Sequence, residues 1–339
     1  MRSATVTPLR SSMAIRILRT SAREESDTHH QDTVWTDTTA RNVSSVVDWR
    51  QRYHHTRSSE AMEVQAVTLD TSAVSELEEL YQRALLLVDD DSRAHLQRYY
   101  HRIDGIRGLI GRLLPRLLLK ELGISKAEMR FFKTQAGKPY ICTKLETPIG
   151  YNVTHDNGVV AMAYSTGADL YPDPPAYRVG VDVMLLQLPK RDTFSGFVEV
   201  FSDQLTRLER NILLPPASEP QLSTHEQLRR FFLIWTLKEA YTKALGLGLG
   251  FDFSRIEYDV PKDVVRIDGQ VPRGWEFIRF ELHNSLNNGH VENYVGVAAQ
   301  YRGEDAVAES RVRAADSPGW VKVQDAKGFL DTAIRELGI

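Results

Sequence analysis

The sequence predicts an α/β (α+β) fold made of two similar halves. The first observation is size, because 339 residues with 42% hydrophobic side chains suffice for one large domain or two modest ones. The second is the alternation of helical and strand-like patterns from about residue 61 to about residue 303. The third is their order, a helix and two strands followed by a helix and two strands again, although the sequence itself shows no repeat.

Four segments follow from this pattern. Residues 1–60 are polar and show little periodicity, so we expect a disordered leader. Residues 61–172 form the N-terminal half and residues 173–303 the C-terminal half, joined by a proline-rich loop from Tyr171 to Pro175. The charged residues 304–339 form a C-terminal extension.

The N-terminal half begins with a strand. Glu63 to Leu69 alternates between polar and apolar residues, which is the pattern of a half-buried strand. Helices are predicted at 75–87 and 92–121, and Gly123 is a suitable C′ glycine for the second. Pro115 lies inside the second helix, where it lacks the backbone N–H that a helix uses, so we expect a kink or break there.

The end of the N-terminal half carries a hairpin. Two short extended pieces at 127–132 and 139–142 come first. Asn157-Gly158 then separates two alternating apolar runs, and this dipeptide is a strong signal for a tight hairpin turn. We expect the hairpin strands at 151–155 and 159–164.

The C-terminal half has the same order. Strands are predicted at 179–184, 275–282 and 294–299, and helices at 194–213 and, beyond the half, at 329–337. Thr224-His225-Glu226-Gln227 has the form of a capping box and opens a strong helix that runs to about Leu245. Gly246 closes that helix.

Charge is informative only locally. The formal net charge of −3 argues neither for nor against an anionic partner. Between Arg98 and Lys133, however, nine lysines and arginines face three acidic residues. Such a basic stretch indicates either a ligand that carries phosphate or a solvated helix face.

Cysteine content and the N-terminus bear on the compartment. Cys142 is the only cysteine, which excludes an internal disulfide and fits a reducing, cytoplasmic setting. No apolar run reaches the length of a membrane span, so we expect no membrane partner. The first 23 residues carry five arginines and seven serines or threonines, with no acid before Glu24. This composition is typical of a mitochondrial presequence and also of a plain disordered tail, and both alternatives stay open.

One predicted helix carries residues suited to catalysis. Glu239 and Lys243 lie four residues apart and therefore share a helical face, which is the spacing of an ordinary surface ion pair as well. Asp182 stands in an otherwise apolar strand, where a carboxylate is costly unless it is paired or bound to a cation. Two carboxylates from separate elements suit Mg²⁺, which takes one or two protein carboxylates and completes its shell with water and substrate phosphates.

Two further positions are candidates with ordinary alternatives. His155 ends a predicted strand, where an imidazole binds a phosphate or a metal or simply satisfies a backbone carbonyl. Lys138 lies in the stiff turn Gly137-Lys138-Pro139, and lysines in surface turns are common.

Taken together, five motifs occur in order within residues 62–300. They are Arg98-Tyr99-Tyr100 with Arg107-Gly108-Leu109-Ile110-Gly111-Arg112; Gly137-Lys138-Pro139; Tyr151-Asn152-Val153-Thr154-His155; Gly180-Val181-Asp182-Val183-Met184; and Trp235-Thr236-Leu237-Lys238-Glu239-Ala240-Tyr241-Thr242-Lys243-Ala244 followed by Gly246-Leu247-Gly248-Leu249-Gly250. This set resembles the 4′-phosphopantetheinyl transferase superfamily, above all its longer single-chain, pseudo-dimeric type, which includes the human aminoadipate-semialdehyde dehydrogenase phosphopantetheinyl transferase. The leader and the residues after about 303 lie outside the resemblance.

The resemblance implies a fold and an activity. The two halves would be related by a pseudo-twofold axis, with the ligand between them. The enzyme would be a holo-[acyl-carrier-protein] synthase that transfers 4′-phosphopantetheine from coenzyme A to a serine of an apo carrier protein and releases adenosine 3′,5′-bisphosphate.

The resemblance also implies roles for single residues. Asp182 and Glu239 would ligate Mg²⁺, and Glu239 would also act as general base for the serine hydroxyl. Lys243 would neutralise charge at the attacked phosphate, and His155 would hold a pyrophosphate oxygen. The implied coenzyme A contacts are Arg98 at the 3′-phosphate, Gly137, Lys138 and Pro139 around the nucleotide, and Asn152, Val153 and Thr154 at the phosphates, with Arg107 and Lys238 as secondary candidates.

Three positions depart from the pattern that the resemblance implies. Thr154 stands where the family usually has serine, which keeps a hydroxyl. Met184 stands where bacterial members often have a third acidic ligand, so water would complete the metal shell. Residues 167–177 form an insertion between the halves.

Partners and alternatives follow from the resemblance and from the charges. The implied partners are apo carrier proteins or domains of fatty acid, polyketide, non-ribosomal peptide or aminoadipate reductase systems, and the enzyme is expected to be a monomer. One alternative is a coenzyme A-binding protein without catalysis. The other is a nucleic-acid-binding module that uses the basic stretch with Tyr99, Tyr100, Phe131 and Phe132, but the acidic pair has no purpose there, so we expect no nucleic acid.

Overall fold

The computed structural model describes residues 62–166, 178–189, 192–247, 250–305, 307, 309–315 and 320–338. All of them belong to one unit that spans Ala61–Ile339. The predicted leader at 1–60, the loop from Tyr171 to Pro175 and the insertion at 167–177 lie outside the described residues.

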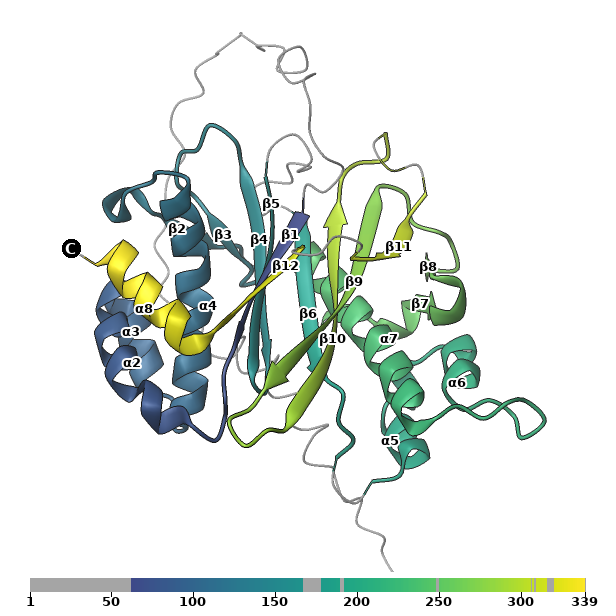
Figure 1. Cartoon of the computed structure of the whole chain (residues 1–339). Helices are drawn as coiled ribbons and strands as arrows, with labels where there is room; N and C mark the ends of the chain where they lie inside the picture. The colour runs from purple at the N-terminus through teal and green to yellow at the C-terminus, as the bar shows by residue number, and fades with distance from the viewer. Residues whose placement is uncertain are drawn as a thin grey trace, which may run out of the picture. The chain divides into compact units, whose positions relative to one another are not determined.

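The N-terminal half contains a four-stranded sheet in the order β12-β1-β5-β4 (Figure 1). Its strands are β1 (Met62–Thr68), β4 (Ile149–Asp156), β5 (Val159–Thr166) and β12 (Val321–Asp325). β5 runs antiparallel to both β1 and β4, whereas β12 runs parallel to β1. The predicted first strand and the hairpin are confirmed, and Asn157 in the hairpin turn has a positive φ of 44°.

The C-terminal half contains a second four-stranded sheet in the order β11-β9-β10-β6. Its strands are β6 (Val179–Leu185), β9 (Trp275–Ser285), β10 (Val291–Tyr301) and β11 (Arg311–Ala314). β10 runs antiparallel to both β6 and β9, and β11 runs parallel to β9. The three predicted strands of this half are therefore confirmed.

The two halves share one topology, as predicted. In each half a first strand (β1 or β6) is followed by helices and then by a hairpin (β4–β5 or β9–β10). The second strand of the hairpin lies between the first strand and the other hairpin strand in both sheets. The halves differ in where the last strands attach, because β12 joins β1 whereas β11 joins β9.

Helices and short strands complete the unit. The N-terminal half has α2 (Glu78–Ala84), α3 (Asp90–Gln97), α4 (Arg102–Glu121), the 3₁₀ turns η2 (Val74–Leu77), η3 (Leu85–Leu87) and η4 (Lys126–Glu128), and the strand pair β2 (Phe131–Lys133) and β3 (Pro139–Ile141). The C-terminal half has α5 (Phe194–Val200), η6 (Ser202–Gln204), α6 (Arg207–Leu213), α7 (Thr224–Leu245), η8 (Phe253–Arg255), η9 (Val260–Lys262) and the strand pair β7 (Ile256–Asp259) and β8 (Val264–Ile267). The last helix is α8 (Ala326–Leu337).

The two faces of β6 serve different purposes. Because side chains alternate along a strand, one face presents Val179, Val181, Val183 and Leu185, and these pack in a common apolar core with residues of β1 and β5. The other face presents Gly180, Asp182 and Met184. A Cβ on Gly180 would lie only 2.0 Å from the Ala240 carbonyl oxygen, so α7 packs directly on this second face.

The long helix predicted in the N-terminal half is interrupted at residues 98–101 and not at Pro115. The helix expected at 92–121 is two helices, α3 and α4, and α4 runs through Pro115 without the predicted break. Residues 97–101 are all exposed, so no buried face stabilises a helix there, whereas Pro115 lies in the buried face of α4. Packing of an apolar face supplies most helix stability in proteins, and it outweighs the one hydrogen bond lost at Pro115.

The helix predicted at 194–213 is also divided. It consists of α5, η6 and α6, and Leu205 between them has extended backbone angles. Thr206 starts a new helix because its hydroxyl accepts from the Glu209 N–H and the Glu209 carboxylate accepts from the Thr206 N–H. This capping box fixes the second start and was not recognised in the sequence.

The catalytic candidate helix begins one residue earlier than the capping pattern predicted. Ser223, not Thr224, is the N-cap of α7, and its hydroxyl accepts from the Glu226 N–H at 3.2 Å. The Gln227 N–H donates to the Ser223 carbonyl oxygen at 2.9 Å, as in a helix that has already begun, so the predicted box is wrong although the helix is confirmed. Gly246 ends α7 in the left-handed conformation with φ of 73°, as predicted.

The residues after 303 contribute to both halves. β11 belongs to the C-terminal sheet, and β12 belongs to the N-terminal sheet. α8, predicted at 329–337, then packs into the core of the N-terminal half, with Phe329, Leu330 and Ala333 fully buried.

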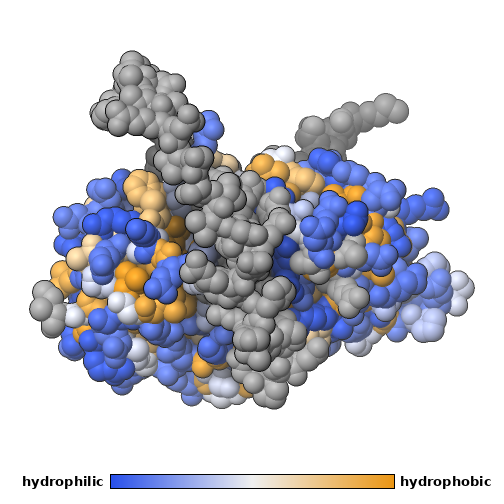
Figure 2. Space-filling model, turned by 90° about the horizontal axis from the view of Figure 1, so that it is seen from above, coloured by the Kyte–Doolittle hydropathy of each residue, from blue (hydrophilic) through white to orange (hydrophobic). Residues whose placement is uncertain are grey.

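The surface of the described residues is mixed in polarity. In the view of Figure 2, polar residues cover much of the visible described surface and hydrophobic residues occur in smaller groups. Leu86, Leu122 and Phe132 are among the exposed hydrophobic side chains of the N-terminal half, which is ordinary for a folded protein. Among the helices that the structure describes, none combines the length and the apolar character needed to cross a bilayer.

Candidate active site

The close approach of α7 to β6 builds the site. Gly180 admits the α7 backbone at Ala240 and Ala244, where any larger side chain would collide with main-chain atoms. Asp182 follows two residues later on the same face of β6, so its carboxylate faces the side of α7 that carries Lys243. Two residues of one sequence motif therefore act together. Gly180 lets α7 approach β6 closely, and this approach brings Lys243 within ion-pair distance of Asp182.

Asp182 joins side chains from both halves. Its Oδ1 atom accepts from Lys243 Nζ at 2.8 Å and from Thr154 Oγ1 at 2.9 Å. Lys243 Nζ also donates to Thr154 Oγ1 at 3.2 Å. β4, β6 and α7 thus meet at one carboxylate oxygen, as expected for a site that neither half can assemble alone.

The second oxygen of Asp182 has the character of a cation ligand. Asp182 is only 5% exposed, and its Oδ2 atom is buried without any hydrogen-bond partner. A buried carboxylate oxygen without a partner is costly, and a bound ion is one of the few arrangements that satisfy it. Within the described ranges no group of three or more His, Cys, Asp or Glu could hold a metal ion. Two carboxylates plus water and phosphate fit Mg²⁺, so the residues present suit this ion.

Glu239 is the second carboxylate. It lies in α7 and is 8% exposed. Burial raises the pKa of Glu239 to about 7; the Lys243 ammonium opposes this rise, and the negative charge of Asp182 adds to it. A carboxylate with a pKa near neutrality is well placed to exchange a proton at physiological pH.

Alternate side chains of β4 bridge to β6. Asn152 Oδ1 accepts from the Val181 N–H at 3.0 Å, Thr154 donates to Asp182, and Asp156 Oδ2 accepts from the Leu185 N–H at 2.8 Å. Asn152 and Thr154 were predicted from the sequence as site residues, whereas Asp156 was not. The period-two spacing from Asn152 was the signal that could have found it.

Val153 and His155 lie on the opposite face of β4 from Thr154, because strand side chains alternate. Val153 packs against the core of the N-terminal half. His155 directly follows Thr154 in the sequence, and its side chain is half-buried. Their contacts with a ligand remain predictions.

Lys138 connects the two halves. It follows Gly137, which has φ of 87°, and precedes Pro139, the first residue of β3. Lys138 Nζ donates to the Ala244 carbonyl oxygen at 2.7 Å and to the Val179 carbonyl oxygen at 3.1 Å. A lysine at the C-terminal end of α7 satisfies carbonyl groups that the helix leaves open. In this geometry Lys138 holds the end of the catalytic helix.

Lys238 lies in a closed cluster. Its side chain is 1% exposed, and it forms an ion pair with the fully buried Glu209 at 2.7 Å. The geometry favours a structural role for Lys238 over contact with coenzyme A.

Arg98 and Arg107 differ in their surroundings. Arg98 is exposed at the C-cap of α3. Arg107 is buried in α4, where its guanidinium donates to the Asn157 carbonyl oxygen at 2.7 Å and to Asp104 at 2.9 Å. Arg107 therefore ties α4 to the hairpin turn that follows Thr154 and His155.

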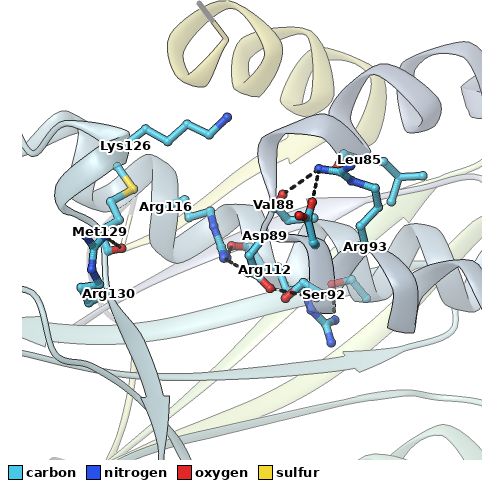
Figure 3. Close-up of polar contacts among 12 residues, drawn as sticks. Leu85, Val88, Asp89, Ser92, Arg93, Arg112, Arg116, Lys126, Met129 and Arg130 are labelled. Carbon is cyan, nitrogen blue, oxygen red and sulfur yellow. Dashed lines mark hydrogen bonds and ion pairs between the residues drawn. The ribbon is translucent and has the colours of Figure 1, made fainter.

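Part of the basic stretch has a local structural role (Figure 3). Arg116 donates to Asp89 at 2.9 Å and to the Arg112 carbonyl oxygen at 2.7 Å, and it lies over the Phe131 ring. Arg130 donates to the carbonyl oxygens of two neighbouring residues, and Lys126 to that of Leu86. These donors support the alternative in which the charges stabilise and solvate a helical surface.

Comparison with known proteins places two family models on this chain. Residues 178–295 match the model described as "4'-phosphopantetheinyl transferase superfamily". Residues 75–167 match the model described as "4'-phosphopantetheinyl transferase, N-terminal". The two matches cover the two halves of the described unit in turn.

Individual proteins are similar over most of the chain. It is 47% identical over 281 residues to the 4'-phosphopantetheinyl transferase pptA of Paxillus involutus, covering 81% of this chain and 100% of that protein. It is 28% identical over 249 residues to a phosphopantetheinyl transferase of a Thraustochytrium species, covering 72% of this chain and 80% of the relative. The human L-aminoadipate-semialdehyde dehydrogenase-phosphopantetheinyl transferase is 25% identical over 209 residues, which are 57% of this chain and 63% of the human protein.

Proposed function

The chain belongs to the 4′-phosphopantetheinyl transferase superfamily and is a phosphopantetheinyl transferase, and on this premise we propose that the transfer takes place at Asp182, Glu239 and Lys243. The substrate that donates the arm is coenzyme A, and the acceptor is a serine of an apo carrier protein. The observation that carries the proposal is the unsatisfied Oδ2 atom of Asp182, which lies in a buried cluster built from both halves.

Asp182 and Glu239 would hold Mg²⁺. When bound, the ion compensates the negative charge of the coenzyme A diphosphate and of the phosphoryl group that is transferred. Asp182 offers Oδ2, while its Oδ1 atom stays fixed by Lys243 and Thr154. The fixed oxygen keeps the free one oriented, which is a form of preorganisation.

Glu239 acts as the general base. A serine hydroxyl is a weak nucleophile while it is protonated, so it needs a base within reach. Glu239 accepts the hydroxyl proton, directly or through water, as the serine oxygen forms its bond to phosphorus. The phosphorus–oxygen bond of the diphosphate breaks, and adenosine 3′,5′-bisphosphate leaves with the bridging oxygen.

Lys243 supplies positive charge beside the reacting phosphate. Its ammonium lies 2.8 Å from Asp182 and 3.2 Å from Thr154, and its side chain remains partly exposed. A partly exposed ammonium in this position is accessible to a phosphate oxygen. Asn152 and Thr154, on the face of β4 that points toward β6, would contact the same diphosphate. Val153 and His155 lie on the opposite face of the strand and would reach the ligand from there.

The nucleotide end of coenzyme A would lie along the N-terminal half. Arg98 is exposed, which leaves its guanidinium accessible to the 3′-phosphate. The turn at Gly137, Lys138 and Pro139 would border the nucleotide through its backbone and aliphatic atoms, since Lys138 Nζ already holds the end of α7. Arg107 would support the site indirectly through the hairpin turn.

The acceptors are carrier proteins or domains of fatty acid, polyketide, non-ribosomal peptide or aminoadipate reductase systems. The name of the human relative favours testing an aminoadipate reductase carrier first. The enzyme acts as a monomer in the cytoplasm, and a mitochondrial location is the alternative. A fluorescent fusion with and without residues 1–23 decides between the two compartments, because only a presequence would direct the fusion to mitochondria.

The decisive experiment is a transfer assay with a panel of apo carriers, coenzyme A labelled in its pantetheine arm, and Mg²⁺. The wild-type chain should label at least one carrier. Glu239→Gln should lower turnover by about 10²-fold or more, because it removes the base while keeping the shape of the side chain. Glu226→Gln, on the same helix but outside the cluster, is the control and should behave as wild type. Turnover by Glu239→Gln at the wild-type rate would remove Glu239 from the mechanism.

A further inference from the structure

A buried ion pair lies on the catalytic helix but outside the Asp182 cluster. Lys238 Nζ and Glu209 Oε2 are 2.7 Å apart, and the two side chains are 1% and 0% exposed. Burying two charges is expensive, and the cost is recovered only where the geometry is good and every remaining donor and acceptor is satisfied. This pair meets that condition.

Every donor of Lys238 is used by a different element. Besides Glu209 in α6, the ammonium donates to the Gln204 carbonyl oxygen in η6 at 2.7 Å and to the Phe253 carbonyl oxygen in η8 at 3.1 Å. Three acceptors match the three protons of an ammonium group. Lys238 therefore binds α7 to three neighbouring segments at once.

Glu209 extends the connections further. Its Oε1 atom accepts from the Tyr258 N–H in β7 at 2.9 Å. Its Oε2 atom also accepts from the Thr206 N–H at the start of α6 at 2.8 Å. Aromatic rings surround the same junction, since Trp235 packs on Phe201 and on Phe253 with centroids 5.1 and 5.4 Å apart.

Lys238 and Glu239 are neighbours in α7 but face different partners. Successive residues of a helix point about 100° apart. Lys238 points toward α6 and η8, so the side chain of Glu239 points away from those two segments. On the β6 side, α7 is fixed by the close backbone contact at Gly180. The ion pair fixes it from the other side, and the two contacts together define the rotation of α7 about its axis.

From this geometry we propose that Lys238 and Glu209 are a positioning pair that sets the orientation of Glu239, and that Lys238 is not a contact for coenzyme A. The inference rests on the proposed function, in which Glu239 is the base. A shift of a catalytic group by about 1 Å can cost about 10²-fold in rate, so loss of the pair should appear in turnover.

The test is a double-mutant cycle with Lys238→Met, Glu209→Gln and the combined variant. Each single change should lower kcat by about tenfold or more and leave KM for coenzyme A within about twofold of wild type. The combined variant should be no slower than the slower single variant, because the two residues act through one interaction. Melting above the assay temperature shows that each variant is folded, and Glu209→Gln alone suffices if Lys238→Met does not fold.

Controls separate this inference from the proposed function. Arg230→Met removes a partly exposed ion pair on the same helix and should leave kcat and KM unchanged. If the wild-type chain labels no carrier, the proposed function fails. If wild type is active and Glu209→Gln equals it, or if Lys238→Met raises KM for coenzyme A about tenfold at unchanged kcat, the positioning pair is refuted and the proposed function stands.

Discussion

The two oxygens of the Asp182 carboxylate have different surroundings. Oδ1 is held by Lys243 and Thr154, whereas Oδ2 is buried without a partner. Such asymmetry is what a ligand of a hard cation needs, because one oxygen orients the group and the other stays available. Under the proposed assignment of Mg²⁺ to Oδ2, this carboxylate links the stability of the site to metal binding.

Asp182→Asn should abolish stabilisation of the protein by Mg²⁺. With coenzyme A present, wild type should melt at a higher temperature as Mg²⁺ increases, because a ligand of the folded state raises its stability. The asparagine keeps the shape of the side chain but lacks the charge that attracts the ion. Thermal unfolding across a Mg²⁺ titration measures the effect, with the exposed Asp331→Asn as control. Equal shifts in wild type and Asp182→Asn would contradict the assignment.

Asp156 gives the protein a pH-dependent weakness. Burial raises the pKa of Asp156, although the hydrogen bond that its carboxylate accepts from the Leu185 N–H opposes the rise. A carboxyl whose pKa is higher in the folded than in the unfolded chain stabilises the fold below the unfolded value. That contribution is lost as the pH rises through the folded pKa. Ionisation of Asp156 therefore costs stability on the alkaline side of its ordinary range.

Asp156→Asn should reduce this loss. The asparagine oxygen still accepts from the Leu185 N–H, but no charge appears when the pH rises. We expect the free energy of unfolding of the variant to fall less than that of wild type between about pH 4 and about pH 8. Urea unfolding in the presence of a chelator at several pH values measures both curves. Parallel curves for the two proteins would show that Asp156 does not titrate in this range.

Single residues were only partly predictable from sequence. Asp182 was singled out because a carboxylate is unusual in an apolar strand. Glu239 and Lys243 have the spacing of an ordinary ion pair, and it was the resemblance to the family that implied their roles. Lys138 and Lys238 look the same as any ligand-binding lysine in the sequence, and only the carbonyl groups and the carboxylate that surround them give them structural roles. Those partners lie up to 106 residues away, beyond any local pattern.

At the scale of elements, two neighbouring hydroxyl residues at the N-terminus of α7 have different roles. Ser223 caps the helix, whereas Thr224 is its first residue. Ser223→Ala should lower the free energy of unfolding by about 1 kcal/mol, because the Glu226 N–H loses its acceptor. Thr224→Ala, the matched control, should change it by less than about 0.5 kcal/mol. Chemical denaturation of both variants measures the free energy of unfolding. A larger decrease for Thr224→Ala than for Ser223→Ala would show that Thr224 is the N-cap, as the sequence pattern predicted.

Elements were predicted well where one local signal dominates. Alternation located β1, a mostly apolar run located β6, and Asn157-Gly158 located the β4–β5 turn. The boundaries were wrong where signals compete. A kink or break was expected at Pro115, and the helix continues through it. The capping box at Thr206 was overlooked inside a stretch that reads as one helix. Tertiary packing and side-chain hydrogen bonds decided these cases, and neither is visible in periodicity.

At the scale of the whole molecule, the C-terminal residues complete the N-terminal half. Phe329 of α8 is fully buried in that core. Phe329→Ala should therefore cost about 3–5 kcal/mol of stability, the range for removing a large buried aromatic side chain. Val323→Ala, a control on the half-exposed β12 neighbour, should cost far less. Urea unfolding measures both, and a loss below about 1 kcal/mol for Phe329→Ala would show that α8 is dispensable to the core.

The two-half architecture was predictable from the order of elements, but the attachment of the chain end was not. Residues 304–339 read as an appended extension because nothing local marks β12 as a partner of β1. Parallel pairing between strands more than 250 residues apart leaves no sequence signature. The contribution of β12 and α8 to the N-terminal half became apparent only in three dimensions.

The pairing of β12 with β1 also imposes an order on biosynthesis. A ribosome releases β1 before every other described element, yet β12, which pairs with one edge of β1, and α8, which closes the core, are translated after all the strands of the C-terminal sheet. β6, β9 and β10 are all complete before then and are free to pair while translation continues. The half that is translated first is therefore completed after the other half, and its core stays partly open until β12 and α8 have been translated.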